Sequence, residues 1–538
     1  MVGRHTASAH ARARALPLLL GVGAVAAVGV GGFAVVSAMS GDDGGGCQGS
    51  VDVRIAAAPE IAPLVTDAVT SLEGEGVEVG GSCLEYDVSA VAPAKVVEVL
   101  SAASENSPHL WVPDFSVWLA RAQAAGADVE VLDASLARTP VVVVGRDLEP
   151  PGSWREVGST TVAFLDPLTS APSTAALLSA FGEMQVTGAS RTEMGAMMVP
   201  LAQRYGGQAD KPRTAEDVAA AAAGGTLGVM SEQQLVALQD GGAAEGLSAA
   251  VPRSGTMMLE YPLVSLSTDA GVEQAGRLVL DALSATDLAE HGFRDAEGAP
   301  LGPDVGLGEA RFNVLAAPEG EAVVDALRQW AVLTVPSRSL AVVDVSGSMD
   351  FTDDEGRSRI ALAVTAAESA LDLFPDSAQI GLWAFSVELG GGGRDYRSLA
   401  PVRRLGASTD GGSHRKDLAK ALRQLPELTG EGTGLHDTTL AAVRTLQEGY
   451  DARAVNTVIL LTDGENDDPG SLSLQELVNT LERERDPARP VAVIAIGMGP
   501  EADAQALRRI AAATGGRSYV AREPADIGQV FVDAMLSR

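Results

Sequence analysis

The chain has 538 residues. A single hydrophobic core rarely extends over so long a chain, so two or three folded units are expected. Hydrophobic residues make up 46% and charged residues 20%, which is a globular rather than a disordered composition. The formal net charge of -32 repels phosphate backbones and argues against nucleic acid as a partner.

The N-terminal stretch predicts a membrane anchor. Arginines within residues 1–14 precede an uncharged run over residues 15–39, which is long enough to cross a bilayer as a helix. Basic residues before the run and acidic residues after it orient the N-terminus inward. We therefore expect a cytoplasmic N-terminus (1–14), a single transmembrane helix acting as a signal anchor (15–39), a linker (40–50) and an extracellular remainder. A cleaved signal peptide is the alternative, because small residues around Ala38 resemble a cleavage site.

The two cysteines of the chain are Cys47 and Cys83. An even number in an exported protein favours a disulfide. The alternative is a lipid-modified Cys47, but the glycines before it lack the aliphatic residue that a lipoprotein signal shows. We expect Cys47 and Cys83 to be bonded to each other.

Residues 51–336 alternate between strand-like and helix-like stretches, which predicts an α/β domain. Short apolar runs such as 140–144 and 161–165 are typical of buried parallel strands. The expected strands are 51–55, 86–91, 140–144, 161–165, 225–230 and 257–264, and a helix is expected from Pro93 to Ala103.

This region resembles type 2 periplasmic solute-binding proteins, the two-lobed receptors of ABC importers. The resemblance rests on four short segments: Ile55-Ala56-Ala57-Ala58-Pro59-Glu60, Trp111-Val112-Pro113-Asp114, Asp166-Pro167-Leu168-Thr169-Ser170 and Glu260-Tyr261-Pro262-Leu263-Val264. Family members that bind oxyanions have a hydroxyl residue at the start of the first helix, where this chain has Pro59 and Glu60. That departure argues against molybdate, sulfate or phosphate as the solute. Glu60, Ser170, Ser173 and Thr174 are the candidate solute-binding residues, and the alternative is that the hydroxyls only cap a helix.

A second α/β pattern starts after Pro336, and we assign residues 337–538 to it. Asp344-Val345-Ser346-Gly347-Ser348 follows directly after an apolar strand, and a helix comes next. Thr433 precedes another helix, and Asp463 ends another apolar strand. Ligands bind at the carboxyl ends of strands in open α/β sheets, so these loops are expected to meet.

Carboxylate and hydroxyl oxygens suit a hard cation such as Mg²⁺. The predicted metal ligands are Asp344, Ser346, Ser348, Thr433 and Asp463, and the cation is Mg²⁺, or Mn²⁺ or Ca²⁺ in its place. Serines near a strand end also cap helices, which is the alternative for the Asp-x-Ser-x-Ser segment alone.

With these residues in order, the segment 337–538 resembles a von Willebrand factor type A (VWA) domain with a metal-ion-dependent adhesion site. The resemblance implies a doubly wound, Rossmann-like fold and a partner protein that presents a carboxylate to the metal. We assign no counterpart in the family to a polar, glycine-rich insertion from about Gly390 to Ser413, and we expect a mobile loop there.

Enzymatic motifs are missing from the sequence: it has no Walker loop, no Gly-x-Ser-x-Gly elbow and no His-Glu-x-x-His helix. His436 lies close to Thr433 in sequence, and we expect it on a helix surface. The sequence therefore predicts a non-enzymatic, membrane-anchored binding protein that recognises a protein through its metal site. The alternative is a receptor that delivers a small solute to an ABC importer, with the VWA domain as an accessory.

Overall fold

The computed structural model of the protein describes residues 47, 49–102, 107–189, 191–208, 211–283, 285–318, 320–352, 356–372, 374–499, 502–521, 526 and 530. The predicted anchor, residues 15–39, lies outside them. Among the helices of the described residues, none combines the length and the apolar character that a membrane crossing requires.

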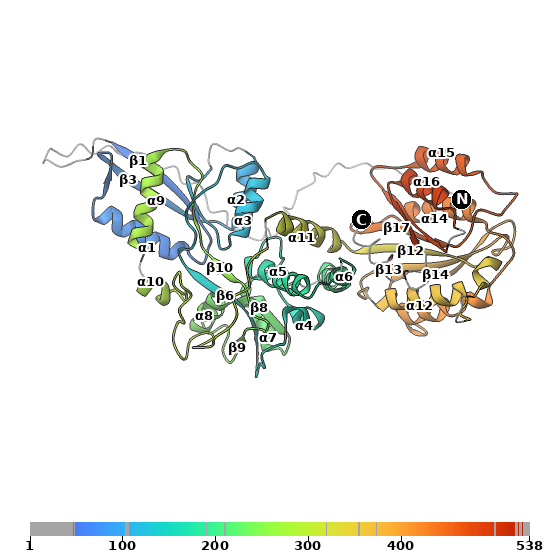
Figure 1. Cartoon of the computed structure of the whole chain (residues 1–538), viewed down its shortest axis with the longest axis horizontal. Coiled ribbons are helices and arrows are strands. Elements are labelled where there is room, and N and C mark those ends of the chain that lie inside the picture. Colours follow the sequence, from blue (N-terminus) through green and yellow to red (C-terminus); the bar gives the residue numbers. More distant parts are fainter. Residues whose placement is uncertain are drawn as a thin grey trace, which may run out of the picture. The chain divides into compact units, whose positions relative to one another are not determined.

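The first of three large sheets has the strand order β2-β3-β1-β4-β11-β5. Its strands are β1 (Ser50–Ala57), β2 (Glu78–Val79), β3 (Ser82–Ala90), β4 (Leu110–Val112), β5 (Glu130–Asp133) and β11 (Leu263–Ser265). β1 runs parallel to β3 and β4, and the late strand β11 runs antiparallel to β4 and β5. Helix α1 (Ala62–Gly74) packs against α9 (Ala270–Ala282), and α2 (Pro93–Ser101) packs against α3 (Val117–Ala124) (Figure 1).

Cys47 and Cys83 form a disulfide at the start of this sheet, with their Cα atoms 5.3 Å apart. Cys83 lies in β3, opposite the first residue of β1. The bond therefore connects the beginning of the described chain to the second strand of the sheet.

The second sheet has the order β10-β6-β8-β7, and β9 also pairs with β6. Its strands are β6 (Arg138–Gly145), β7 (Val162–Ala163), β8 (Leu227–Ser231), β9 (Ser248–Ala250) and β10 (Met258–Glu260). Besides α9, the helices that follow β5 in this part of the chain are α4 (Trp154–Ser159), α5 (Ala171–Val186), α6 (Arg191–Gly207), α7 (Ala215–Ala223), α8 (Glu232–Asp240), α10 (Ala285–Glu290) and α11 (Gly320–Leu333). The expectation of a parallel strand over 140–144 is wrong, because β6 is antiparallel to β8, β9 and β10.

The single strand expected over 257–264 is divided between the two sheets. β10 belongs to the second sheet and β11 to the first, and Tyr261 and Pro262 separate them. Proline has no N–H to donate to a strand ladder, which explains the break. Tyr261 is fully buried, and its ring meets that of Phe293 edge to face at 5.0 Å.

The third sheet has the order β14-β13-β12-β17-β18-β19. Its strands are β12 (Ser337–Asp344), β13 (Gln379–Phe385), β14 (Tyr396–Arg404), β17 (Val455–Thr462), β18 (Val491–Met498) and β19 (Arg517–Ala521). The short elements are η1 (Gly347–Asp350), η2 (Leu425–Glu427), β15 (Ser408–Thr409) and β16 (Gly412–Ser413), and the helices are α12 (Arg359–Asp372), α13 (His414–Leu422), α14 (Leu435–Glu448), α15 (Leu474–Glu484) and α16 (Ala504–Thr514). All the pairings are parallel except that of the edge strand β14.

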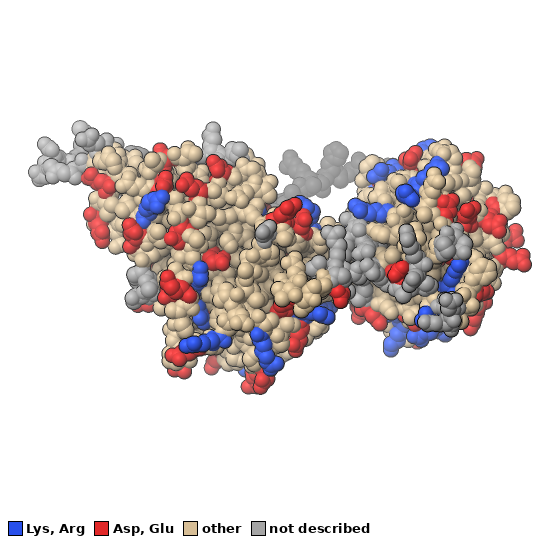
Figure 2. Space-filling view, in the orientation of Figure 1, with Lys and Arg blue, Asp and Glu red and all other residues tan. Residues whose placement is uncertain are grey.

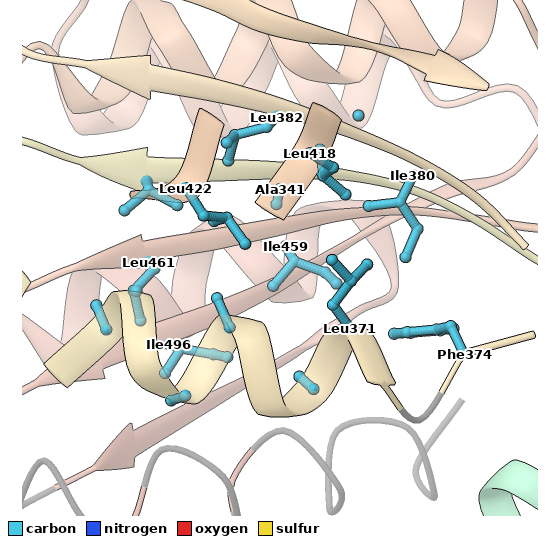
Figure 3. A pocket seen from close by; sticks show the side chains of 16 residues that line it. Ala341, Leu371, Phe374, Ile380, Leu382, Leu418, Leu422, Ile459, Leu461 and Ile496 are labelled. Atoms are coloured by element: carbon cyan, nitrogen blue, oxygen red, sulfur yellow. The ribbon is translucent and has the colours of Figure 1, made fainter. Parts of the chain in front are cut away.

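The central strand β12 is apolar on both faces because helices cover both. Leu340 and Val342 pack into a core with α14, α15 and α16. Ala341 and Val343 face α12 and α13 across an apolar hollow of about 90 Å³ (Figure 3). In Figure 1 α12 lies on one side of this sheet and α14 to α16 on the other. This doubly wound arrangement brings the carboxyl ends of β12 and β17 to one edge.

The insertion from Gly390 to Ser413 is mostly ordered structure, and the expectation of a mobile loop there is wrong. Its middle forms β14, which pairs with β13. Trp383 on β13 and Tyr396 on β14 stack with their ring centres 4.0 Å apart. An edge strand is exposed on one side, which is why its sequence is polar enough to resemble a loop.

On the face shown in Figure 2, Asp and Glu (red) lie among fewer Lys and Arg (blue) across the described residues. This distribution is consistent with the net charge of -32.

Candidate metal centre

Asp344 is the last residue of β12 and is fully buried. The backbone N–H of Ser346 donates to its Oδ1 at 2.8 Å, and the hydroxyl of Thr462 donates to its Oδ2 at 2.5 Å. Burial is the main cause that raises the pKa of Asp344 to about 6, and the nearby charge of Asp463 acts in the same direction. A buried carboxylate with only neutral hydrogen-bond donors is a favourable position for a cation.

The two serines of the loop lie beside each other. Their Oγ atoms are 3.2 Å apart, and Ser348 Oγ donates to Asp463 Oδ1 at 2.7 Å. Ser346 is 2% exposed, whereas Ser348 is only half-buried. Neither hydroxyl makes a cap hydrogen bond to η1 in the described structure, so the helix-capping alternative is not supported for this turn.

Asp463 directly follows β17 and is fully buried. Its Oδ1 accepts from Ser348, and its Oδ2 lies 2.8 Å from Nη1 of Arg359, the first residue of α12. Sequence reasoning missed Arg359, because it is 104 positions away from Asp463 and no motif marks it.

Thr433 reaches the same place on a loop shaped by its two neighbouring glycines. Gly432 has φ +69°, and a Cβ on Gly434 would lie 2.4 Å from the Cβ of Asp395. Backbone hydrogen bonds in both directions connect Thr433 with Asp467, at 3.2 and 3.0 Å. A Cβ placed on Gly464 would lie 3.9 Å from Ser348 Oγ and 4.0 Å from Thr433 Oγ1, so both hydroxyls face the same glycine.

The structure thus brings together all five predicted ligands, which we call the strand-edge site: Asp344, Ser346, Ser348, Thr433 and Asp463. The loops are also connected through the backbone, since the N–H of Gly430 donates to the carbonyl of Val345 at 2.8 Å. Every side-chain ligand atom in the site is an oxygen, the donor type that Mg²⁺, Mn²⁺ and Ca²⁺ prefer. The donor set and the two buried carboxylates fit a hard divalent cation.

His436 is not on the helix surface as expected. It is 6% exposed in the first turn of α14, and its Nδ1 lies 2.7 Å from the carbonyl oxygen of Leu472. Its backbone N–H donates to Oδ1 of Asn466 at 3.1 Å. The residue thus connects the start of α14 to the loop between β17 and α15.

A second group of carboxylates lies near Thr433 and was not found from the sequence. One carboxylate oxygen from each of Asp395, Asp437 and Asp468 lies within 4.8 Å of the others. Burial raises the pKa of Asp395, and the charges of Asp468 and Asp437 add to this. The three residues come from three separate segments of the chain, so no local pattern could have marked them.

The candidate solute-binding residues lie in two places. Glu60 precedes α1 rather than opening it, and its Oε1 accepts from the hydroxyl of Tyr261 at 3.0 Å. Burial raises the pKa of Glu60. Burial also raises the pKa of Asp114 well above its usual value, and the charge of Glu60 adds to this. The indole N–H of Trp118 donates to Asp114 Oδ1 at 2.6 Å.

The three hydroxyl residues are buried around the start of α5. Ser170 Oγ donates to Ser173 Oγ at 3.3 Å, Ser173 Oγ accepts from the N–H of Leu165 at 3.1 Å, and Thr174 Oγ1 donates to the carbonyl of Ser170 at 2.9 Å. Ser170 occupies the N-cap position without a cap bond from its side chain to the described helix. These hydroxyls hold the loop to the helix rather than projecting from it.

Comparisons with known proteins identify a family for the C-terminal part of the chain. Residues 340–532 match the family model of the von Willebrand factor type A domain. The chain is 25% identical over 528 residues to "Uncharacterized protein MT1884" of Mycobacterium tuberculosis (strain CDC 1551 / Oshkosh) and, equally, to "Uncharacterized protein Rv1836c" of strain ATCC 25618 / H37Rv, covering 87% of this chain and 74% of each relative.

Solved structures with a similar fold fall into two groups. A von Willebrand factor type A protein from Catenulispora acidiphila is 22% identical, covers 37% of this chain and 42% of its own, and has a TM-score of 0.30. The sulfate-binding protein SubI from Mycobacterium tuberculosis H37Rv is 16% identical, with a TM-score of 0.35, and the match covers 47% of this chain and 88% of SubI. A ferric binding protein from Campylobacter jejuni is 13% identical, with a TM-score of 0.38, and the match covers 52% of this chain and 98% of that protein. The family match and the fold together identify residues 340–532 as a von Willebrand factor type A domain, with the strand-edge site at the carboxyl edge of its sheet.

Proposed function

We propose that the protein is a membrane-anchored, outward-facing binding protein that recognises a protein partner through a divalent cation in the strand-edge site. The observation that supports this is the convergence of Asp344, Asp463 and three hydroxyls from three loops at one sheet edge. The ligand set offers two carboxylates and neutral hydroxyls, a combination that leaves coordination positions for water or for an outside oxygen. A carboxylate of the partner is the ligand expected there.

The rim of the site supports a protein partner. Phe351 follows η1 and is 62% exposed, which is unusual for a large aromatic side chain. Its ring centre lies 5.5 Å from the guanidinium carbon of Arg359, which contacts the ligand Asp463. Aromatic side chains, including Phe, are enriched at protein interfaces relative to the rest of the surface.

A second candidate function is that of a solute receptor for an ABC importer. It is supported by the two-sheet architecture of residues 51–336, in which β10 and β11 carry the chain from one sheet to the other. A cationic solute fits the buried carboxyl groups of Glu60 and Asp114 better than an anion does.

The proposed function is tested by calorimetric titration of the full-length protein in detergent with Mg²⁺. Wild type should bind one cation, and Asp344→Ala and Asp463→Ala should not. Asp350→Asn is the matched control, because Asp350 is an exposed aspartate of the same turn outside the ligand set. Partner capture from cell-surface extracts should then require Mg²⁺, disappear with chelator, and fail for both ligand variants. Equal Mg²⁺ binding by all four proteins would overturn the proposal.

A further inference from the structure

Arg359 is a cationic side chain placed directly on the proposed ligand set. Its Nη1 lies 2.8 Å from Oδ2 of Asp463, its side chain is 18% exposed, and Asp463 is fully buried. Asp463 Oδ1 is held by Ser348, so Arg359 contacts the oxygen that the serine leaves available. A divalent cation that uses this oxygen must displace the guanidinium or share the oxygen with it.

The start of a helix is an unfavourable position for the positive charge of the Arg359 guanidinium. It is the first residue of α12, and the N-terminal end of a helix carries a partial positive charge that repels a cation. The backbone N–H of Arg359 donates to the carbonyl of Phe351 at 3.0 Å, which fixes the start of the helix close to the site. The ion pair with Asp463 contributes to holding a guanidinium at this end of the helix.

The charge of Arg359 changes what the loaded site attracts. The charges of Asp344 and Asp463 sum to minus two, and the guanidinium on Asp463 Oδ2 makes the site one unit more positive than the two carboxylates alone. Without the arginine, the two aspartates and the cation would sum to zero. A site loaded with a divalent cation therefore attracts an additional anionic ligand more strongly with Arg359 than without it.

We propose that Arg359 is a specificity-determining residue that weakens binding of the cation alone and couples its binding to a carboxylate ligand. This inference rests on the proposed function and adds the residue that makes the partner's carboxylate favourable. In the absence of a carboxylate, the cation competes with Arg359 for Asp463. In its presence, the ligand offsets the positive charge, and cation and carboxylate stabilise each other's binding.

The test is calorimetric titration of the full-length protein in detergent with Mg²⁺, in sodium chloride and in sodium acetate of equal ionic strength. Wild type should bind Mg²⁺ more tightly in acetate, after correction for the Mg²⁺ that acetate itself binds. Arg359→Gln should bind Mg²⁺ at least about tenfold more tightly than wild type in chloride, because a unit positive charge is removed from a buried ligand. Acetate should also strengthen Mg²⁺ binding less in this variant than in wild type. Arg357→Gln is the matched control, since it removes an exposed arginine two positions away and should stay within about twofold of wild type.

The outcomes separate the two proposals. Mg²⁺ binding by wild type and by Arg359→Gln with equal affinity would overturn the role of Arg359 and leave the cation site standing. No Mg²⁺ binding by either protein would overturn both. If Arg359→Gln does not fold, the comparison of chloride with acetate on wild type decides, and equal affinities in the two salts contradict the coupling.

Discussion

Asp344→Asn tests whether the strand-edge site is built for a cation, because the change keeps the shape of the side chain and removes its charge. The pKa of Asp344 rises from 3.8 to about 6 in the folded protein without metal. At roughly 1.4 kcal/mol per pH unit, the ionised carboxylate costs about 3 kcal/mol of folding free energy at pH 7.5. The amide of the variant retains an oxygen that accepts from the N–H of Ser346 and has no such cost. The variant should therefore melt above wild type when metal is removed.

The pH dependence follows from the direction of this shift. A carboxyl group with a raised folded-state pKa favours folding in its protonated form, so its contribution is fully present below about pH 4 and is lost as pH rises through 6. The advantage of Asp344→Asn over metal-free wild type should thus be largest at pH 7.5 and close to zero at pH 4. Thermal melts in chelator at both values measure it.

Added Mg²⁺ should reverse the order of the two proteins. Wild type gains roughly 2.7 kcal/mol at a hundredfold excess of Mg²⁺ over its dissociation constant, and the variant, lacking a charged ligand, gains much less. Asp463→Asn is the informative comparison, because it removes the ion pair between the buried Asp463 and Arg359 and should melt below wild type in chelator. A wild-type melting temperature that Mg²⁺, Mn²⁺ and chelator all leave unchanged at millimolar concentrations would refute the cation site. Melting of Asp344→Asn below wild type in chelator at pH 7.5 would refute the burial argument.

Three further predictions concern the rest of the chain. Glu60→Gln should raise stability at neutral pH and leave it nearly unchanged at pH 4. The reason is that burial raises the folded-state pKa of Glu60, and its ionised form also opposes ionisation of Asp114. Urea unfolding at both pH values checks this, and an equal change in stability at both pH values contradicts it. Removing the disulfide between Cys47 and Cys83 by Cys83→Ser should lower the free energy of unfolding by about 4 kcal/mol, since the two residues are 36 positions apart. Unfolding curves with and without reductant, together with non-reducing peptide maps, provide the measurement. A variant as stable as oxidised wild type would argue against this prediction. Residues 15–39 should keep the protein in salt-washed membranes; quantitative release of protein beginning near residue 40 would establish cleavage instead.

The residues of the strand-edge site could be predicted to lie together because each one is marked locally. Asp344, Ser346 and Ser348 are close together in sequence after an apolar strand, and Asp463 ends another. Parallel strands with crossover helices place such ends at one edge, so the topology brings the residues together without any knowledge of side-chain contacts. Arg359 has no such mark, because its relation to Asp463 depends on the reach of one side chain across the edge.

Errors in the predicted elements arose where tertiary context overrides the local pattern. The segment 257–264 reads as one apolar strand, yet Pro262 breaks it and its halves belong to different sheets. The segment around Tyr396 reads as a polar loop, yet it completes the sheet as an edge strand held by the stack on Trp383. In both cases the decisive partner is distant in sequence, and hydrophobic periodicity reports only on neighbours.

The two aspartates of the strand-edge site have different kinds of partners, and this difference connects stability with function. Asp463 has a cationic partner in Arg359, whereas Asp344 is held by a backbone N–H and a hydroxyl. A bound cation therefore neutralises the buried charge of Asp344, which only neutral groups contact. At Asp463, the cation competes with Arg359 for the carboxylate. The burial that destabilises the metal-free fold at Asp344 is also what strengthens the attraction for a cation, because the same low-dielectric surroundings act on both. A site built in this way holds its cation most firmly when an outside carboxylate offsets the charge of the arginine, which makes recognition of an acidic partner a consequence of how the ligands are buried.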